Sequence, residues 1–123
     1  MLPHILLVED NQFVIGALRL LLEETGHRVS DASSIAVASR VLHADPPDLV
    51  LLDLTLGGED GLSLLSSIDA IGAPRPIVVA LTGRDEPETL ERCTRAGCRA
   101  VLVKPIRPLE LKSQIAGWLG ERV

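Results

Sequence analysis

Acidic side chains stand at the ends of two apolar runs in the first half of the chain. Glu9 and Asp10 follow the run 4–8, and Asp53 follows the run 49–52. In an open parallel α/β sheet the ligand crevice lies outside the carboxyl ends of the strands, so these carboxylates are predicted to converge on one site. Ligation by oxygen alone suits Mg²⁺ better than zinc or copper, which favour nitrogen and sulfur. The pattern therefore predicts a magnesium site suited to phosphoryl chemistry.

Two further residues at strand ends extend this site. Thr82 follows the apolar run 77–81, and Lys104 follows the run 100–103. A metal ion, a lysine and a hydroxyl are groups that hold phosphoryl oxygens, and a carboxylate can act as the nucleophile that accepts the phosphoryl group. Each residue alone has an ordinary explanation, such as a helix N-cap for Asp10 or a surface charge for Lys104. Their shared position at the ends of four strands favours a common site.

Five apolar runs alternate with five helical segments, which indicates a parallel sheet with helices on both faces. The expected strands are 4–8, 28–32, 49–53, 77–81 and 100–103, and the expected helices begin near Asn11, Ser34, Asp60, Glu86 and Pro108. This order predicts a doubly wound α/β fold: a five-stranded parallel sheet of order 2-1-3-4-5 in three flavodoxin-like layers. The first and third strands would then be neighbours, and the three acids would meet at the switch point.

The helices differ in the apolar surface that they offer to the core. The fourth, over 86–96, has only Leu90, Cys93 and Ala96 as an apolar stripe, so we expect it to be the least anchored. The first is expected to bury a longer stripe, formed by Val14, Leu18, Leu21 and Leu22.

Length and composition limit the classes of function. The 123 residues fit one domain, 1–123, and the net charge of −5 with dispersed basic residues shows no nucleic-acid or membrane footprint. No apolar stretch approaches the roughly 20 residues of a membrane span, so we expect a cytoplasmic protein. Cys93 and Cys98 match neither a redox pair nor a zinc site and are expected to be free thiols. None of the three histidines lies at the C-terminal end of an expected strand, which favours structural roles.

Specific motifs cover the whole chain: ILLVEDN at 5–11, DLVLLDL at 48–54, GEDG at 58–61, ALTG at 80–83, AG at 96–97 and LVKP at 102–105. With these motifs the chain resembles a response-regulator receiver domain of two-component signalling, of the chemotaxis-Y-like kind. The resemblance implies that Asp53 is the phosphoacceptor and that Glu9 and Asp10 form the acid pocket for Mg²⁺. It also implies that Thr82 supplies the switch hydroxyl and that Lys104 contacts the phosphate. The backbone carbonyl of Thr55 would be a further metal ligand.

The same resemblance implies a signalling domain and not a conventional enzyme. The phosphodonor would be a phosphohistidine on a sensor histidine kinase or a histidine phosphotransfer protein. The domain would catalyse its own phosphorylation and a slow autodephosphorylation, whose rate the side chains of Thr55 and Arg84 would tune. We expect a monomer or weak dimer without direct contact to nucleic acid or membrane.

The chain departs from the family pattern at three positions. Val101 stands where a Tyr or Phe is usual, Gly57 replaces a common proline and Ile106 a common phenylalanine. These changes leave phosphoryl acceptance intact but put the usual output surface in doubt. One alternative is therefore a phosphate-independent protein-interaction module, although such a module could lose the acids, Thr82 and Lys104 at little cost.

A second alternative is a phosphohydrolase that forms an aspartyl phosphate, as haloacid-dehalogenase-like enzymes do. Those enzymes carry the nucleophile on the first strand, usually with a second acid two residues later. Here the candidate nucleophile follows the third strand, and Thr55 occupies the later position. The sequence therefore favours the receiver over the hydrolase.

Overall fold

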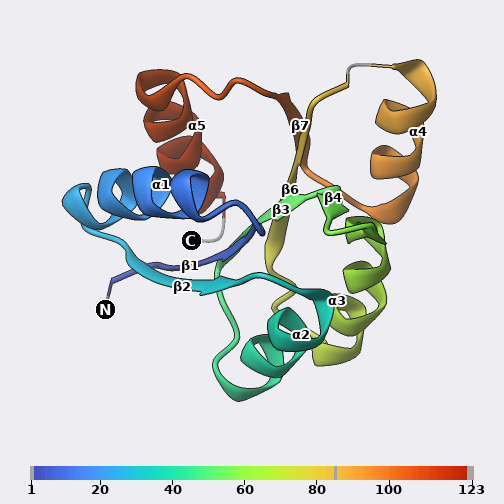
Figure 1. The fold of residues 1–123 in the computed structure, drawn as a ribbon. Helices are drawn as coiled ribbons and strands as arrows, with labels where there is room; N and C mark the ends of the chain where they lie inside the picture. The colour runs from blue at the N-terminus through green and yellow to red at the C-terminus, as the bar shows by residue number, and fades with distance from the viewer. Residues whose placement is uncertain (1, 85, 122–123) are drawn as a thin grey trace.

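The computed structural model describes residues 2–84 and 86–121, and it contains a parallel sheet between two layers of helices (Figure 1). The sheet has the order β2-β1-β3-β6-β7, which is the predicted order 2-1-3-4-5 of the five long strands. The fold prediction is thus confirmed. The strands of this sheet are β1 (His4–Val8), β2 (Arg28–Ala32), β3 (Leu49–Asp53), β6 (Ile77–Thr82) and β7 (Ala100–Val103).

Alternate residues of the central strands enter two separate cores, because successive side chains of a strand point to opposite faces. Ile5 and Leu7 of β1 pack with α1 (Gln12–Glu24) and α5 (Pro108–Gly120). Leu6 and Val8 of the same strand pack with α2 (Ile35–Ala44) and α3 (Leu65–Ile71) on the other face. Strands buried on both faces need apolar side chains throughout, which explains why these strands are continuous apolar runs without alternation.

The helices are short, and the first two begin next to the polar residues expected at their starts. The side chains of Asn11 and Ser34 accept backbone N–H groups at the starts of α1 and α2. Both α1 and α5 have 13 residues. Among the residues that the structure describes, no helix is long and apolar enough to cross a membrane.

The buried stripe of α1 is wider than predicted. Ile15 is buried together with Leu18 and Leu22, whereas Val14 and Leu21 are only partly buried. All four residues of the expected stripe pack on the core, and Ile15 is buried in addition to them.

The helix α4 (Pro87–Ala96) is anchored mainly by polar contacts. It buries only Cys93. Leu90, which was expected in the apolar stripe of this helix, is 38% exposed and lies outside the core. At the end of the helix the Arg75 guanidinium donates to the carbonyl of Ala96 at 3.3 Å and to that of Gly97 at 3.1 Å. Nearer the middle of the helix, Arg92 forms an ion pair with Asp60, which lies in the segment after β3. The expectation of a weakly buried helix is confirmed.

The segment that follows Asp53 forms a small hairpin that the sequence did not predict. The strands β4 (Thr55–Leu56) and β5 (Glu59–Asp60) pair antiparallel and are joined by Gly57 and Gly58. Asp60 then caps a 3-10 helix (Gly61–Leu64) by accepting the N–H of Leu62 at 3.1 Å. The predicted third helix therefore begins as a 3-10 turn and continues as α3.

The cysteines and histidines have structural surroundings. Cys93 and Cys98 are free, and burial raises the pKa of Cys98 to about 12, so both thiols are unreactive at neutral pH. His27 and His43 contact backbone carbonyls of Leu22 and Ser39. The expectation of free thiols is confirmed.

Stability is expected to fall below neutral pH in part because of His4. Its ring is buried, with Nε2 at 2.7 Å from the Ser30 hydroxyl. Burial lowers the pKa of His4 and the charge of Arg28 lowers it further, while the acids Asp45 and Asp48 oppose both effects. Since the folded pKa lies below the unfolded value, the stabilisation is present above about pH 6.5 and is lost as the pH falls through the folded pKa.

Urea unfolding at about pH 7 and at about pH 5.5 measures this loss. The His4→Asn variant should lose less stability over the same interval than the parent protein does. An equal loss in the parent and the variant would assign the effect to other groups.

Candidate functional site

The site lies where the order of the sheet reverses. β1 pairs with β2 on one side and with β3 on the other, so the connections after β1 and β3 leave the sheet toward opposite faces. A crevice opens at such a switch point outside the carboxyl ends of the strands. Glu9 and Asp10 directly follow β1, and Asp53 is the last residue of β3.

The three predicted acids are brought together. Glu9, Asp10 and Asp53 each offer a carboxylate oxygen, and these oxygens lie within 4.8 Å of one another. Glu9 is 1% exposed and Asp53 is 6% exposed, whereas Asp10 faces solvent. Three carboxylates with oxygen as the only donor atom fit a hard divalent cation such as Mg²⁺. The cluster could therefore hold a metal ion at the mouth of the crevice.

Lys104 reaches the same cluster from the edge strand β7. Its Nζ lies 3.0 Å from Glu9 Oε2 and 3.0 Å from Asp53 Oδ2. The backbone N–H of Lys104 donates to the carbonyl of Thr82 at 2.7 Å, which continues the pairing of β7 with β6 beyond the strand end. Burial favours the neutral amine, but the hydrogen bonds to Asp53 and Glu9 outweigh it and raise the pKa of Lys104. The lysine is therefore charged at neutral pH.

Glu9 is held on both carboxylate oxygens. Oε1 accepts the backbone N–H of Asn11 at 3.2 Å, and Oε2 accepts from Lys104. Burial raises the pKa of Glu9 and contact with Asp53 raises it further, while the Lys104 ammonium opposes both. Burying the carboxylates of Glu9 and Asp53 beside the single ammonium of Lys104 costs desolvation free energy. A cation that enters the cluster would offset this cost.

Asp53 is held in a similar way by the loop that follows it. Oδ1 accepts the backbone N–H of Thr55 at 2.9 Å, and Oδ2 accepts from Lys104. The N–H of Leu54 donates to the carbonyl of Leu81 at 3.0 Å and ties the loop to β6. The metal-ligand role of the Thr55 carbonyl stays a prediction.

Thr82 ends a strand of the same sheet, but its hydroxyl is hydrogen-bonded to a residue outside the cluster. The residue is 7% exposed and ends β6, and its hydroxyl accepts the N–H of Arg84 at 3.1 Å. Within the described part of the chain, no hydrogen bond links this hydroxyl to Asp53 or Lys104. The structure thus gathers Glu9, Asp10, Asp53 and Lys104 at one place and leaves the Thr82 hydroxyl as a separate group.

Gly61 is a residue of the site that the sequence analysis missed. A Cβ atom at this position would lie 2.2 Å from the backbone oxygen of Asp53 and 2.9 Å from Cα of Leu54. Its N–H donates to the Leu54 carbonyl at 3.0 Å. The backbone of this segment crosses directly against the residue that ends β3, and only glycine allows that approach. The second glycine of the GEDG motif, directly after the capping residue Asp60, is the sequence signal for this close approach.

Gly61→Ala is expected to destabilise the fold by about 3 kcal/mol, because the new methyl group meets backbone atoms that cannot move aside. Chemical denaturation measures the loss. The matched control is Gly117→Ala in α5, where nothing lies within 4 Å of the added Cβ and the helix should gain about 0.5–1 kcal/mol. Equal stability of the two variants would contradict the close approach at Gly61.

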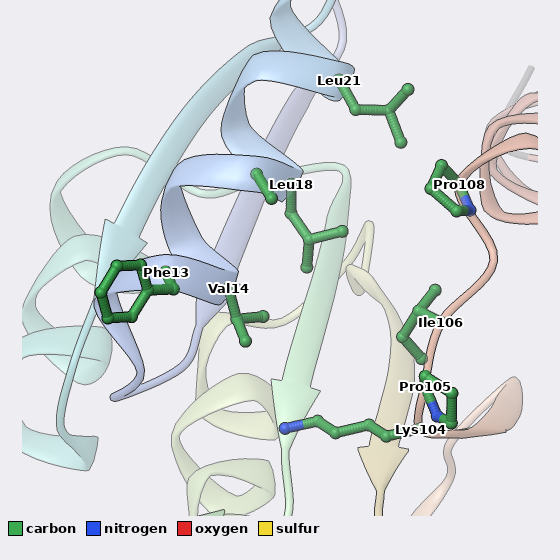
Figure 2. A pocket seen from close by; sticks show the side chains of 9 residues that line it. Phe13, Val14, Leu18, Leu21, Lys104, Pro105, Ile106 and Pro108 are labelled. Atoms are coloured by element: carbon green, nitrogen blue, oxygen red, sulfur yellow. The ribbon is translucent and has the colours of Figure 1, made fainter.

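An apolar groove of about 620 Å³ begins at Lys104 and runs between α1 and the segment before α5. Figure 2 shows Val14, Leu18 and Leu21 on α1 facing Ile106 and Pro108 across it, with Lys104 directed toward the end of β3. Phe13 also lines the groove and is 90% exposed. The groove is thus a nonpolar surface that leads directly to the charged cluster.

The sheet order, the acids after the first and third strands and the lysine on the edge strand define a receiver-like α/β domain. In agreement, the family of response regulator receiver domains matches residues 5–116. The chain therefore belongs to the response regulator receiver domain family, and the resemblance inferred from its motifs is confirmed.

Curated relatives are transcriptional regulators of greater length. The chain is 36% identical over 119 residues to the alginate biosynthesis transcriptional regulatory protein AlgB of Pseudomonas putida, covering 97% of this chain and 26% of AlgB. It is 32% identical over 112 residues to the transcriptional regulatory protein PhoP of Escherichia coli, covering 91% of this chain and 50% of PhoP. The chain thus spans between a quarter and a half of these relatives.

Solved structures of receiver domains have the same fold. A CheY-like receiver domain protein from Methanospirillum hungatei superposes with a TM-score of 0.91 at 25% identity, over 98% of this chain and 96% of that chain. The receiver domain of the sensor histidine kinase PA1611 from Pseudomonas aeruginosa superposes with a TM-score of 0.85 at 30% identity, over 98% and 99% of the two chains. That domain holds a magnesium ion in its active site cleft.

Proposed function

We propose that this chain accepts a phosphoryl group on Asp53 and that Lys104, Thr82 and the acids Glu9 and Asp10 make the transfer possible. The observation that carries the proposal is the double contact of Lys104 with Asp53 and Glu9, each at 3.0 Å, beside a third carboxylate. A lone ammonium set among carboxylates is the arrangement that can neutralise a phosphoryl group attached to one of them.

The proposed step is a displacement at phosphorus. An oxygen of Asp53 forms the new P–O bond, and the P–N bond of a phosphohistidine breaks with its electron pair going to the imidazole. The Lys104 ammonium stays within reach of the transferred oxygens and offsets their charge. Phosphoryl transfer needs little more than an aligned nucleophile and such positive charge, so the domain would catalyse its own phosphorylation.

Glu9, Asp10 and Asp53 are the side chains that would hold Mg²⁺, with the carbonyl of Thr55 as a further ligand. Their oxygen-only donor set fits this ion. When bound, Mg²⁺ would supply positive charge for the phosphoryl oxygens. Asp10 is the exposed acid and is expected to contact the ion directly, whereas Glu9, bonded on both oxygens, is expected to act through water.

Output is proposed to begin at Thr82. Adding about 1.5 to 2 negative charges to Asp53 offers the Thr82 hydroxyl a strong acceptor. The Thr82 hydroxyl is bonded to the N–H of Arg84, in the segment that precedes α4. Because α4 buries only Cys93, this helix can shift at a low cost in free energy. Hydrolysis of the acyl phosphate would reverse the change.

The test is incubation with acetyl phosphate and Mg²⁺, followed by mass spectrometry of the intact chain. Incorporation of a phosphoryl group that depends on Mg²⁺ supports the proposal. Failure to incorporate it, with the chain folded, would favour the phosphate-independent interaction module.

The phosphodonor is proposed to be a sensor histidine kinase or a histidine phosphotransfer protein. The imidazole of the donor protein must reach Asp53 from the open side of the crevice. The donor protein must therefore contact the surface of this chain around the crevice. The groove between α1 and Ile106 is apolar and ends at Lys104, and it offers the donor a surface to bury. We propose this groove as the contact surface for the histidine-bearing partner.

Phe13→Ala is expected to slow phosphotransfer from a protein donor by roughly tenfold, because an exposed aromatic side chain beside the groove is lost from the contact. Acetyl phosphate needs no docking surface, so its rate should not change. The donor is the fastest one found in a panel of phosphorylated histidine kinases.

Leu20→Ala provides the control, because Leu20 is 62% exposed on the same helix but does not line the groove. Its rates should equal those of the parent with both donors. Equal rates for Phe13→Ala and Leu20→Ala with the protein donor would place the contact elsewhere.

A further inference from the structure

Asp10 differs from the other two carboxylates of the acidic cluster in how it is held by hydrogen bonds. Glu9 and Asp53 each accept hydrogen bonds on both oxygens. Asp10 is exposed, and within residues 2–84 and 86–121 its carboxylate accepts a single hydrogen bond, from the backbone N–H of Gly57 at 2.8 Å. The orientation of this carboxylate therefore depends on the hairpin that contains Gly57.

The hairpin presents that N–H through a turn with an unusual backbone. Leu56 pairs with Glu59, so Gly57 and Gly58 form a two-residue turn with φ of 52° and 92°. Two positive φ angles in succession are the mark of a type I′ turn, which suits glycine and asparagine. Proline, the residue that the resemblance leads one to expect at position 57, has no N–H and cannot adopt this angle.

We propose that the N–H of Gly57 is a positioning group for Asp10 as a metal ligand, an inference that rests on the proposed Mg²⁺ site. A carboxylate has about four lone-pair positions, so the bond from Gly57 to Oδ2 leaves the others free for a cation. Carboxylates that bind metals are regularly oriented by a second hydrogen bond, and its loss weakens metal binding by roughly 10- to 100-fold. Gly57 supplies that bond from the backbone.

The opposite role makes the opposite prediction. If the N–H competed with the cation for Oδ2, its removal would strengthen metal binding. The sign of the change in Mg²⁺ affinity therefore decides between positioning and competition.

The sharpest test replaces Gly57 with glycolic acid through an α-hydroxy acid incorporated at that position. The resulting ester lacks the N–H and keeps the remaining backbone. Calorimetric titration with Mg²⁺ should show roughly tenfold weaker binding than in the parent. The matched control is the same substitution at Gly58, whose N–H donates no backbone hydrogen bond outside the strand pairing within residues 2–84 and 86–121. It should bind Mg²⁺ as the parent does.

Two side-chain variants provide a second route that needs no ester. Gly57→Asn keeps the N–H and tolerates positive φ, so its Mg²⁺ affinity should match the parent. Gly57→Pro removes the N–H and should bind about as weakly as the ester. Circular dichroism verifies that both variants are folded.

Unchanged or tighter Mg²⁺ binding in the Gly57 ester would overturn the positioning role. Asp10→Ala separates this failure from that of the proposed function. If Asp10→Ala loses Mg²⁺ binding while the ester does not, only the role of Gly57 is wrong. If Asp10→Ala binds Mg²⁺ as the parent does, the metal site itself is wrong, and the inference is overturned with it.

Discussion

Asp53→Asn is expected to abolish phosphorylation by acetyl phosphate, with no incorporation above background. The substitution keeps the size of the side chain but replaces the nucleophilic carboxylate with an amide. The other acids are poor substitutes. Glu9 is 1% exposed and bonded on both oxygens, and among the described residues Asp10 forms no ion pair with a lysine. Mass spectrometry of the intact chain, after incubation with Mg²⁺ and acetyl phosphate, measures the loss.

Glu59→Gln is the matched control, because Glu59 is an exposed acid in the loop that follows Asp53 but is not part of the carboxylate cluster. It should accept phosphate as fully as the parent. Parental incorporation by Asp53→Asn would assign the phosphoacceptor to a different residue and remove the central step of the proposed function.

Asp10→Ala is expected to abolish Mg²⁺ binding and, with it, phosphorylation. Removing the exposed acid leaves only the two buried carboxylates, which Lys104 already bridges. Because Glu9 is bonded on both oxygens, the ion would lose one of the two carboxylates expected to contact it directly. Calorimetry measures the first effect, and incorporation from acetyl phosphate measures the second.

The control for this variant is Glu24→Ala, which removes an exposed acid at the end of α1 far along the chain from the cluster. Both Mg²⁺ affinity and phosphorylation should be unchanged. Loss of phosphorylation in Asp10→Ala without loss of Mg²⁺ binding would show that Asp10 acts on the phosphoryl group itself.

The sequence by itself determined the central strands β1, β3 and β6, because strands buried on both faces must be apolar throughout and are bounded by residues that are not. It also determined where the acids would meet. Once the order of the sheet was predicted, the carboxyl ends of the first and third strands could only be neighbours. The clustering of Glu9, Asp10 and Asp53 followed without any knowledge of distances.

Only the tertiary structure decided which polar groups touch. Lys104 contacts Glu9 and Asp53 across 95 and 51 residues of sequence, whereas in the described part of the chain the Thr82 hydroxyl makes no hydrogen bond to Asp53. Strand position limits a side chain to a region, but a hydrogen bond depends on a few tenths of an ångström. The same reason explains the wider stripe of α1, where burial of Ile15 depends on how closely α5 approaches.

The hairpin after Asp53 escaped prediction for a different physical reason. The N–H of Gly57 and the close approach at Gly61 belong to the backbone, and the backbone is the same at every residue except proline. A sequence can show where glycine permits an unusual backbone angle, as the Gly57–Gly58 pair does. Which acceptor the freed N–H then meets is decided only when the hairpin folds against Asp10.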